Sequence, residues 1–223
     1  MKYYPVCLDI KNRDCLVVGG GAVACRKVKT LLECGARVTV ISPVFSEELE
    51  TMDNKALTLV RRPYEAADVA GRFLVIGATN DETLNREISR DAETGNILCN
   101  IADVPDACNF ILPAIVKRGD LLLAISTCGN SPAFAKHLRK NLEKTFGEEY
   151  TEFLRLMGAV RKKLLATQHA PEEHKPLFEA LINAGLLEMV REKKTNDINR
   201  LLKDTVGDIL GDHCDYDTLM GCQ

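Results

Sequence analysis

Apolar runs and helically spaced apolar positions take turns along the first half of the chain. A short apolar run covers residues 15–18, and apolar residues then return at helical spacing over residues 22–34, before Gly35 as a stop signal. A second apolar run, residues 37–42, follows directly. This order predicts a βαβ unit, whose strands are parallel and whose crossover is right-handed. Three basic residues of the helix are expected to face outward: Arg26, Lys27 and Lys29.

The same alternation continues to about residue 101. Further strands are predicted at residues 57–60, 72–79 and 97–101. Between the last two, a helix capped by Asn80 or Asp81 is expected to run to about Glu93. Ahead of the first strand, residues 5–10 are expected to form a short edge strand. Strands and helices in this order predict an α/β fold with a Rossmann-type parallel sheet.

The pattern changes after residue 113. Residues 114–117 and 121–126 indicate an antiparallel strand pair, and Pro132 suits the first turn of a helix that reaches about Phe146. Beyond Gly147 only helical patterns remain, at residues 148–167, 172–184, 186–193 and 195–210, and the last dozen residues are expected to fray. We therefore predict three domains: a Rossmann domain at 1–113, a small α+β region at 114–147 and a helical C-terminal domain at 148–223.

Composition and charge narrow the function classes. The chain has 223 residues, of which 46% are hydrophobic, so it can bury a sizeable core. Its formal net charge of −3 argues against nucleic acid as the main partner. No apolar run is long enough to span a membrane, and the first ten residues lack a signal-peptide pattern. These features predict no membrane partner and a cytoplasmic location.

The nine cysteines argue against a disulfide framework or a thiolate metal centre. Their number is odd, and no two of them have the C-x-x-C spacing of zinc or iron–sulfur ligands. Most lie in apolar segments and are expected to be buried, reduced thiols. Only Cys128, in a glycine-containing loop, is expected near chemistry.

The turn between the first strand and the first helix has the spacing of a dinucleotide-binding motif. Gly19, Gly21 and Ala24 fill the three small positions of G-x-G-x-x-G/A. In this motif the first glycine permits a tight turn, the second lets a pyrophosphate approach the backbone, and the third small residue lets helix and strand pack closely. The following helix offers free N–H groups and its positive dipole end to an anion. We therefore predict that Gly19 and Gly21 contact a dinucleotide cofactor.

The ends of the other strands add candidates. An NAD site usually has an acidic residue at the end of the second strand, but Ser42 stands there, Glu47 and Glu48 lie too far on, and no arginine follows. Spacing therefore leaves NAD against NADP open. Ala78 and Thr79 are the small residues expected where backbone meets cofactor. Ligands in such sheets bind beyond the carboxyl ends of the strands, so Asp103, after the fifth strand, is expected to reach a substrate there.

Three stretches taken together resemble one family. They are VVGGGAVACRK at 17–27, NIADVPDACNFILPAIVKRGDLLLAIST at 100–127 and GNSPAFAKHLRKNLE at 129–143. They resemble the precorrin-2 dehydrogenases of siroheme synthesis, and the match covers about residues 3–147. The resemblance implies NAD-dependent oxidation of precorrin-2 to sirohydrochlorin; some members also insert ferrous iron to give siroheme. No tetrapyrrole methyltransferase module follows in this sequence, so a stand-alone enzyme is expected.

The resemblance also implies roles for individual residues. Ala22 and Val23 of the glycine turn, and Pro43 and Val44 after the second strand, carry over as cofactor contacts. The family tends to lack an acid at that strand end, which accounts for Ser42. Asp103, the aspartate of an Asn-x-x-Asp segment, carries over as the main catalytic residue. Siroheme synthase has a serine, reported as phosphorylated, where Thr127 stands here.

Other residues compete for or assist this chemistry. Removing a hydride and a proton from a reduced tetrapyrrole needs a base, and Asp103 is the candidate, with Asp106 and His137 as alternatives. A structural role in the turn before Pro105 is the other interpretation of Asp103. The spacing of His169 and His174 does not place them on one helical face, so no dedicated metal site is predicted. Basic residues suited to the carboxylates of the substrate are Arg118, Lys136, Arg139 and Lys140.

The small region at 114–147 predicts a homodimer. A strand pair and one helix are too small to bury their own core, and residues 121–125 form one apolar run. The related family is likewise dimeric through this region. The alternative function is a non-enzymatic NAD-sensing Rossmann module with a helical, partner-binding tail. The Asn100–Asp103 segment favours the enzyme, since a sensor does not need it.

Overall fold

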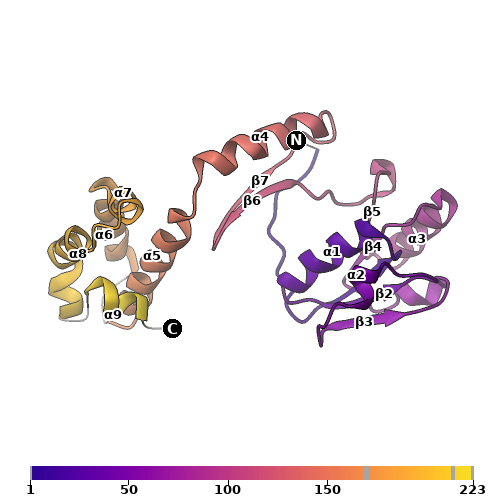
Figure 1. Cartoon of the computed structure of the whole chain (residues 1–223), viewed down its shortest axis with the longest axis horizontal. Coiled ribbons are helices and arrows are strands. Elements are labelled where there is room, and N and C mark those ends of the chain that lie inside the picture. The colour runs from indigo at the N-terminus through magenta and orange to yellow at the C-terminus, as the bar shows by residue number, and fades with distance from the viewer. Residues whose placement is uncertain (1, 168–170, 212–213, 222–223) are drawn as a thin grey trace. The chain divides into compact units, whose positions relative to one another are not determined.

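The computed structural model describes residues 2–167, 171–211 and 214–221 and divides into two compact units, Met1–Leu112 and Pro113–Gln223 (Figure 1). The predicted division of the second unit near residue 147 stays a prediction.

The first unit is built on a five-stranded parallel sheet, as the sequence pattern predicts. Its strands lie in the order β3-β2-β1-β4-β5. Their bounds are β1 Asp14–Val18, β2 Arg37–Ile41, β3 Leu57–Val60, β4 Leu74–Gly77 and β5 Leu98–Ile101. In register, Val18 lies beside Ile41 on one side and Gly77 on the other. The carboxyl ends of the three central strands therefore meet at one edge.

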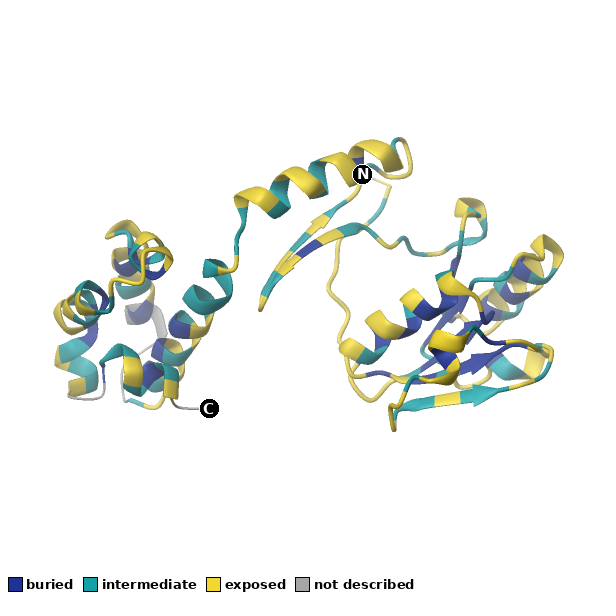
Figure 2. Ribbon diagram, viewed as in Figure 1, coloured by how far each residue is buried: buried dark blue, intermediate teal, exposed yellow. Residues whose placement is uncertain are grey.

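Two hydrophobic clusters lie on the opposite faces of this sheet. On one face Cys15 and Val17 pack against Ala24 and Val28 of α1 (Ala22–Glu33). On the other face Leu16 and Val18 pack against Ile88 of α3 (Glu82–Thr94). The buried strands stand out in dark blue between their helices in Figure 2. Three short helices complete the unit: α2 Glu47–Glu50, η1 Ala66–Val69 and η2 Pro105–Ala107.

The beginning of this unit differs from the prediction. Residues 5–10 form no strand; the chain there is extended without regular pairing. Ile10 is buried in the core, but Val6 and Leu8 remain 60% and 45% exposed, so most of the segment's apolar side chains are not held against the sheet. The sequence of this segment predicted an edge strand, but a strand must pair with a neighbouring strand, and residues 5–10 pair with none in this unit.

The second unit begins with the predicted antiparallel pair, β6 Ala114–Arg118 and β7 Leu121–Ile125, in which Val116 lies opposite Leu123. Helix α4 (Pro132–Thr145) starts with a proline, and the Ser131 hydroxyl caps it by accepting the N–H of Phe134 at 3.2 Å. The remaining helices are α5 Glu149–Leu165, α6 Pro171–Asn183, α7 Leu186–Arg191, α8 Thr195–Leu210 and α9 Tyr216–Gly221. Their shared core centres on Leu156, Leu181, Leu186 and Leu202, all fully buried.

The C-terminal end also differs from the prediction. Among the described residues of the last dozen, Cys214 and Leu219 are buried in the helical core, and Tyr216–Gly221 forms α9. Arg155 donates a hydrogen bond to the carbonyl of Met220 at 2.9 Å. Fraying is therefore the wrong expectation for residues 214–221, because Cys214 and Leu219 pack into the helical core, which the sequence pattern does not reveal.

The cysteines divide between core and surface. Cys15, Cys25, Cys99 and Cys214 are buried, as predicted, whereas Cys7, Cys34 and Cys128 are exposed; Cys222 lies outside the described residues. Desolvation raises the pKa of Cys15 to about 11 and that of Cys99 to about 12, so both thiols stay protonated at neutral pH. None of the described helices is both long enough and apolar enough to cross a membrane.

Candidate functional site

A cleft of about 510 Å³ opens at the carboxyl ends of β1, β2 and β4. Three short segments form most of its wall: Gly19–Gly21, Ser42–Ser46 and Ala78–Asn80. Seven of the residues predicted to bind the cofactor line it: Gly19, Gly21, Ser42, Pro43, Val44, Ala78 and Thr79. The cleft thus lies where a doubly wound sheet binds its ligand, beyond the strand ends.

Gly19 and Gly20 are glycines because the protein itself requires them. Gly19 has φ of +121°, and a Cβ there would lie 2.3 Å from the carbonyl oxygen of Ala78. A Cβ on Gly20 would lie 1.9 Å from the carbonyl oxygen of Val44. The turn is pressed between the segments that follow β2 and β4, so no side chain fits. The requirement at Gly20 does not follow from the motif spacing.

Gly21 is different, because nothing in the described protein requires a glycine there. Its φ of −85° suits any residue, and a Cβ built on it meets no described atom within 4 Å. The free space lies at the cleft and at the start of α1. A glycine that the fold does not need, next to a helix N-terminus, fits a phosphate that must approach the backbone closely. The residues present therefore fit the pyrophosphate of a dinucleotide.

The start of α1 presents its backbone rather than its side chains. Ala22 and Val23 begin the helix, and the first turn of any helix leaves its N–H groups without partners inside the helix. Ala22 is exposed and Val23 half-buried, while Ala24 is fully buried against the sheet, as the third small position of the motif demands. Neither Ala22 nor Val23 belongs to the cleft lining, so their predicted cofactor contacts stay predictions.

The segment after β2 carries hydroxyl groups where an acid is usual. The Ser42 hydroxyl donates to the carbonyl oxygen of Val44 at 2.7 Å, which shapes the turn through Pro43. The N–H of Ser46 donates to the carbonyl of Gly20 at 2.8 Å. The Ser46 hydroxyl is buried and, among the described residues, has no hydrogen-bond partner. Sequence reasoning missed Ser46, which lines the cleft and offers a free hydroxyl to a ligand.

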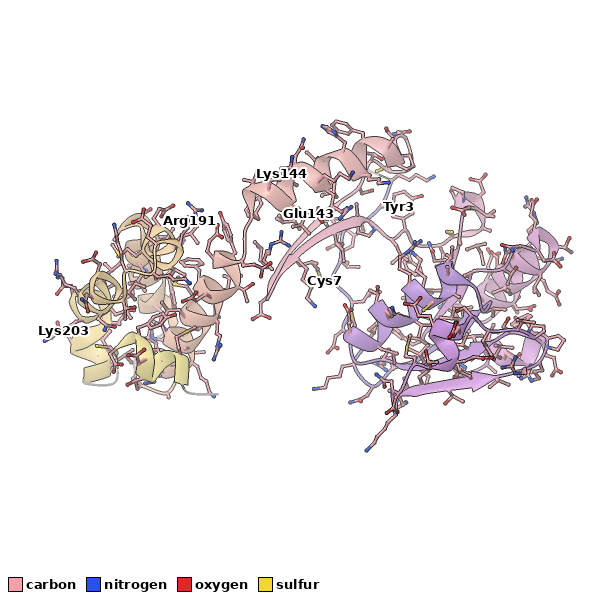
Figure 3. The ribbon with its side chains drawn as sticks, in the orientation of Figure 1. Tyr3, Cys7, Glu143, Lys144, Arg191 and Lys203 are labelled. Atoms are coloured by element: carbon pink, nitrogen blue, oxygen red, sulfur yellow. The ribbon has the colours of Figure 1, made fainter. Side chains whose placement is uncertain are left out.

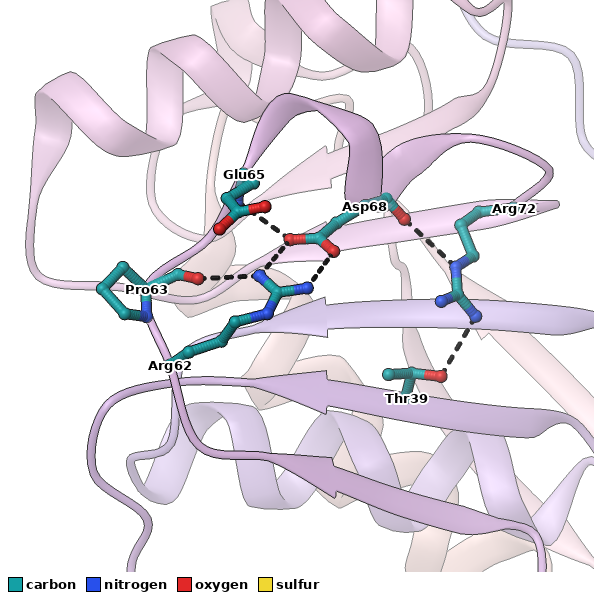
Figure 4. A network of polar contacts seen from close by, with 6 residues as sticks. All are labelled: Thr39, Arg62, Pro63, Glu65, Asp68 and Arg72. Carbon is teal, nitrogen blue, oxygen red and sulfur yellow. Dashed lines mark hydrogen bonds and ion pairs between the residues drawn. The ribbon is translucent and has the colours of Figure 1, made fainter.

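Sequence reasoning also missed the wall formed by Pro63 and Tyr64. Figure 4 shows how a polar network holds this wall. The Arg62 guanidinium donates to both carboxylate oxygens of Asp68, at 2.8 and 2.5 Å, and to the carbonyl of Pro63 at 2.9 Å. Arg72 links the carbonyl of Asp68 to the hydroxyl of Thr39. The hydrogen bonds from Arg62 lower the pKa of Asp68, so this carboxyl stays ionised.

The segment after β4 is pinned by side chains. The Thr79 hydroxyl donates to the side-chain oxygen of Asn85 at 2.9 Å, and the Asn85 amide donates back to the carbonyl of Thr79 at 3.0 Å. The next helix is capped by Asp81, one of the two predicted caps, whose carboxylate accepts the N–H of Leu84 at 3.1 Å. Ala78 and Thr79 therefore present a fixed backbone to the cleft.

Asp103 lies outside this cleft, on the loop after β5. Because β4 lies between β1 and β5, and neighbouring strands are about 5 Å apart, β5 lies about 10 Å from the strand that enters the glycine turn. Asp103 is exposed and has φ of +61°, a left-handed backbone that is rare for a residue with a side chain. Such conformations concentrate at functional sites.

Lys27 corrects one expectation about α1. Arg26 and Lys29 are exposed as predicted, but Lys27 is half-buried. Desolvation, together with repulsion from Arg26, lowers its pKa, and attraction from Asp103 opposes this shift. The electrostatic attraction between Lys27 and Asp103 was not predicted, because helical spacing alone does not show which distant charges act on a residue of α1.

Other candidates have structural partners. Asp106 lies exposed on η2, and the exposed His137 contacts Asn141 one turn along α4 at 3.1 Å. Arg118 donates to the carbonyl of Glu143 at 3.0 Å and also pairs with Glu148. Glu143 and its neighbour Lys144 are labelled on α4 in Figure 3. Arg118 therefore ties β6 to the end of α4.

Of the remaining candidates, Arg139 pairs with Glu143, whereas Lys136 and Lys140 are exposed. The exposed Cys128 has a left-handed backbone in the loop before α4. The described residues contain no group of three or more His, Cys, Asp or Glu side chains that could hold a metal ion. Of the four histidines, His169 and His213 lie outside the described residues.

Comparison with known proteins extends this picture to both units. Residues 6–114 match the family described as putative NAD(P)-binding, and residues 118–145 match the family described as the central part of a sirohaem biosynthesis protein. The solved structure of SirC, a precorrin-2 dehydrogenase, superposes with a TM-score of 0.69 and 32% identity, covering 81% of this chain and 89% of SirC. The chain belongs to the precorrin-2 dehydrogenase family.

Longer relatives share the same region. Siroheme synthase of Vesicomyosocius okutanii is 36% identical over 92% of this chain, and that of Nitrosomonas europaea is 37% identical over 85%. The chain spans less than half the length of these relatives, 45% and 40% respectively. Membership of the precorrin-2 dehydrogenase family confirms the predicted fold class and the dinucleotide-binding character of the first unit. The individual site residues stay predictions.

Proposed function

We propose that this chain oxidises precorrin-2 to sirohydrochlorin with NAD as the acceptor, as one step of siroheme synthesis. The observation that carries the proposal is the match to SirC over 89% of that chain, which spans both units. The open space at Gly21 supports the cofactor half of the proposal, since a bound pyrophosphate would account for a glycine that the described protein does not require. A non-enzymatic NAD sensor would not need the left-handed Asp103 loop.

NAD rather than NADP is the acceptor that the charges favour. An extra 2′-phosphate would need a free cation near the end of β2 or β3. Arg62 is held by Asp68, and Arg61 pairs with Glu50. Lys29 of α1 pairs with Glu48. The Ser46 hydroxyl offers a neutral partner for a ribose hydroxyl instead.

The chemistry divides between the two regions of the first unit. When bound, NAD accepts a hydride from the substrate. The Gly19–Gly21 turn and the N-terminus of α1 hold the pyrophosphate, and the backbone of Ala78 and Thr79 fixes the neighbouring wall. Asp103 accepts the proton that the macrocycle loses, which general base catalysis requires.

The experiment mixes the purified chain with precorrin-2 and either NAD or NADP under anaerobic conditions and follows the absorbance of sirohydrochlorin. We expect product with NAD and much slower formation with NADP. The Asp68→Asn variant, which releases Arg62, should improve the use of NADP relative to NAD. Binding of NAD without any oxidation would favour the sensor instead.

Two further proposals concern partners. A homodimer through the β6–β7 region is supported by Ile115 and Leu122, which are 41% and 47% exposed on one side of the strand pair. Sedimentation at micromolar concentration should give a dimer mass, and Leu122→Glu should shift it towards a monomer.

Ferrous iron insertion, implied by the resemblance, is tested by adding Fe²⁺ to the same reaction and following siroheme. A cytoplasmic location stays a proposal.

A further inference from the structure

The loop that carries Asp103 is short and tightly turned. Between Ile101, where β5 ends, and Cys108, the N–H of Val104 donates to the carbonyl of Ile101 at 3.4 Å, and the N–H of Ala107 donates to that of Val104 at 3.1 Å. Asp103 sits inside the first of these turns with its left-handed backbone. Aspartate adopts this conformation at a lower cost than most residues with a side chain, and the hydrogen bonds of the turn keep it in place.

One sulfur atom joins the two ends of that turn. The Cys108 thiol accepts the N–H of Ile101 at 3.1 Å and lies 3.3 Å from the carbonyl oxygen of Ile101 and 3.2 Å from that of Val104. Its single proton is shared between these two carbonyls. Ile101 and Val104 flank Asp103, so the thiol fixes the backbone on both sides of the aspartate. Desolvation raises the pKa of Cys108, which keeps the thiol protonated and able to donate.

The sulfur is itself held against the sheet. Asn109, the next residue, lies along the free edge of β5, where its side-chain oxygen accepts the N–H of Cys99 at 2.7 Å and its amide donates to the carbonyl of Ile97 at 2.8 Å. On the other side, the Ser89 hydroxyl of α3 donates to the carbonyl of Ala107 at 2.9 Å. Cys108 is therefore anchored by both of its neighbours before it reaches the Asp103 turn.

We propose that Cys108 is a positioning residue for Asp103, whose thiol clamps Ile101 to Val104 and so sets the direction of the Asp103 carboxylate. This inference rests on the proposed function, in which Asp103 takes the proton. It assigns Cys108 a polar role, although a half-buried cysteine beside apolar residues would ordinarily be counted with the core. Misplacing a catalytic group by about 1 Å can cost about 100-fold in rate.

The test compares Cys108→Ala, which removes the clamp, with Cys108→Ser, which keeps a donor and an acceptor. Cys99→Ala is the matched control, because it shortens a buried cysteine two positions before Ile101 whose thiol, among the described residues, makes no hydrogen bond. Each substitution is made in the wild-type chain and in Asp103→Asn. The measurements are kcat and KM for precorrin-2 oxidation and hydrogen exchange at the Ile101 amide.

We expect Cys108→Ala to lower kcat about 10- to 100-fold with an unchanged KM for NAD, Cys108→Ser to retain most of the rate, and Cys99→Ala to match wild type. In the Asp103→Asn background, Cys108→Ala should change kcat little, since both substitutions act through one group. The Ile101 amide should exchange faster in Cys108→Ala. An equal loss of kcat in both backgrounds, or unchanged exchange at Ile101, overturns the proposal.

Different results would contradict the proposed function and the Cys108 clamp. A wild-type chain that binds NAD but never oxidises precorrin-2 contradicts the proposed function. Hydrogen exchange at Ile101 then decides the clamp alone, because it does not depend on turnover. If Cys108→Ala does not fold, Cys108→Val decides in its place, because it keeps the size of the side chain and cannot hydrogen-bond: faster exchange at Ile101 together with a lower kcat than wild type supports the clamp, and unchanged exchange contradicts it.

Discussion

The glycine turn and the Asp103 loop follow strands of the same sheet, yet they are held by different means. Backbone packing fixes the glycine turn, because Gly19 and Gly20 press directly on the carbonyl groups of Ala78 and Val44. Side chains fix the Asp103 loop, chiefly the Cys108 thiol and the Asn109 amide. At Gly19 and Gly20 this packing leaves no room for an added atom, whereas a loop fixed by side chains can be altered one hydrogen bond at a time.

This difference suits the two tasks. A pyrophosphate needs a rigid cradle of N–H groups, which close backbone packing supplies. A base needs its carboxylate aimed at one atom of the substrate, and hydrogen bonds to the flanking residues supply that direction. Substitutions in the two regions should therefore have different effects, because cofactor binding depends on the glycine turn and turnover on the Asp103 loop.

The largest effect is expected from Gly21→Asp, which should abolish NAD binding. The new carboxylate would fill the open space at the cleft and repel the phosphates. The fold should survive, because aspartate is a favourable residue at a helix N-cap. Calorimetric titration with NAD, beside a thermal unfolding curve, checks both statements. Undiminished affinity would remove the cofactor assignment.

Asp103→Asn should lower the rate of precorrin-2 oxidation about 10²–10⁴-fold, the usual contribution of a general base. The amide keeps the size of the carboxylate and, like aspartate, tolerates a left-handed backbone, so the loop should hold its shape. NAD affinity should stay within about twofold of wild type. Steady-state kinetics and calorimetry on one preparation test this, and full activity would make Asp103 a turn residue, with Asp106 and His137 next to examine.

Gly20→Ala should lower the free energy of unfolding by about 1–3 kcal/mol, the usual cost of overpacking. Its Cβ would lie 1.9 Å from the carbonyl oxygen of Val44, so the segment after β2 must move. Urea unfolding followed by circular dichroism measures the loss. Unchanged stability would mean that the turn is less tightly pressed than its geometry indicates.

Asp68→Asn should lower the free energy of unfolding by about 1 kcal/mol at neutral pH, an amount discounted for the partial exposure of Arg62. Because Arg62 lowers the folded-state pKa of Asp68 below its ordinary value of 3.8, the contribution is full above that value and disappears as pH falls through the folded-state pKa. Unfolding curves of both proteins should therefore converge in acid. A constant difference at every pH would contradict this.

The smallest effect on stability is expected from Gly21→Ala. The backbone there suits alanine and the Cβ meets no described atom, so the free energy of unfolding should change by less than about 1 kcal/mol. NAD affinity should nevertheless fall about tenfold or more, since the methyl group lies where the pyrophosphate approaches. Equal losses in stability and affinity would show that the fold itself needs this glycine.

Sequence reasoning reached the strands, the glycine turn and the cap at Asp81 because each has a local signal. Apolar runs, glycine spacing and capping residues act within a few positions of the structure they specify. The position of Asp103 beyond β5 follows from the same pattern. The hydrogen bonds that Cys108 makes to the Asp103 turn do not follow from this pattern, because the sequence shows Cys108 only as one of nine cysteines.

The remaining differences come from contacts distant in sequence. Lys27 is half-buried, and attraction from the distant Asp103 raises its pKa against desolvation, whereas helical spacing shows only which residues share a side. Leu219 reaches the helical core although it lies close to the C-terminus. Val6 and Leu8 alternate like a strand but have no neighbour in their own unit to pair with. Each of these depends on tertiary packing, which local patterns do not encode.

The stoichiometry of the reaction tests the proposed NAD-dependent oxidation of precorrin-2 most directly. The chain, precorrin-2 and NAD are mixed without oxygen, and NADH and sirohydrochlorin are followed by absorbance in the same cuvette. We expect one NADH for each sirohydrochlorin, at a rate that falls about 10²–10⁴-fold in Asp103→Asn. Sirohydrochlorin without matching NADH, or an equal rate in Asp103→Asn, would contradict it.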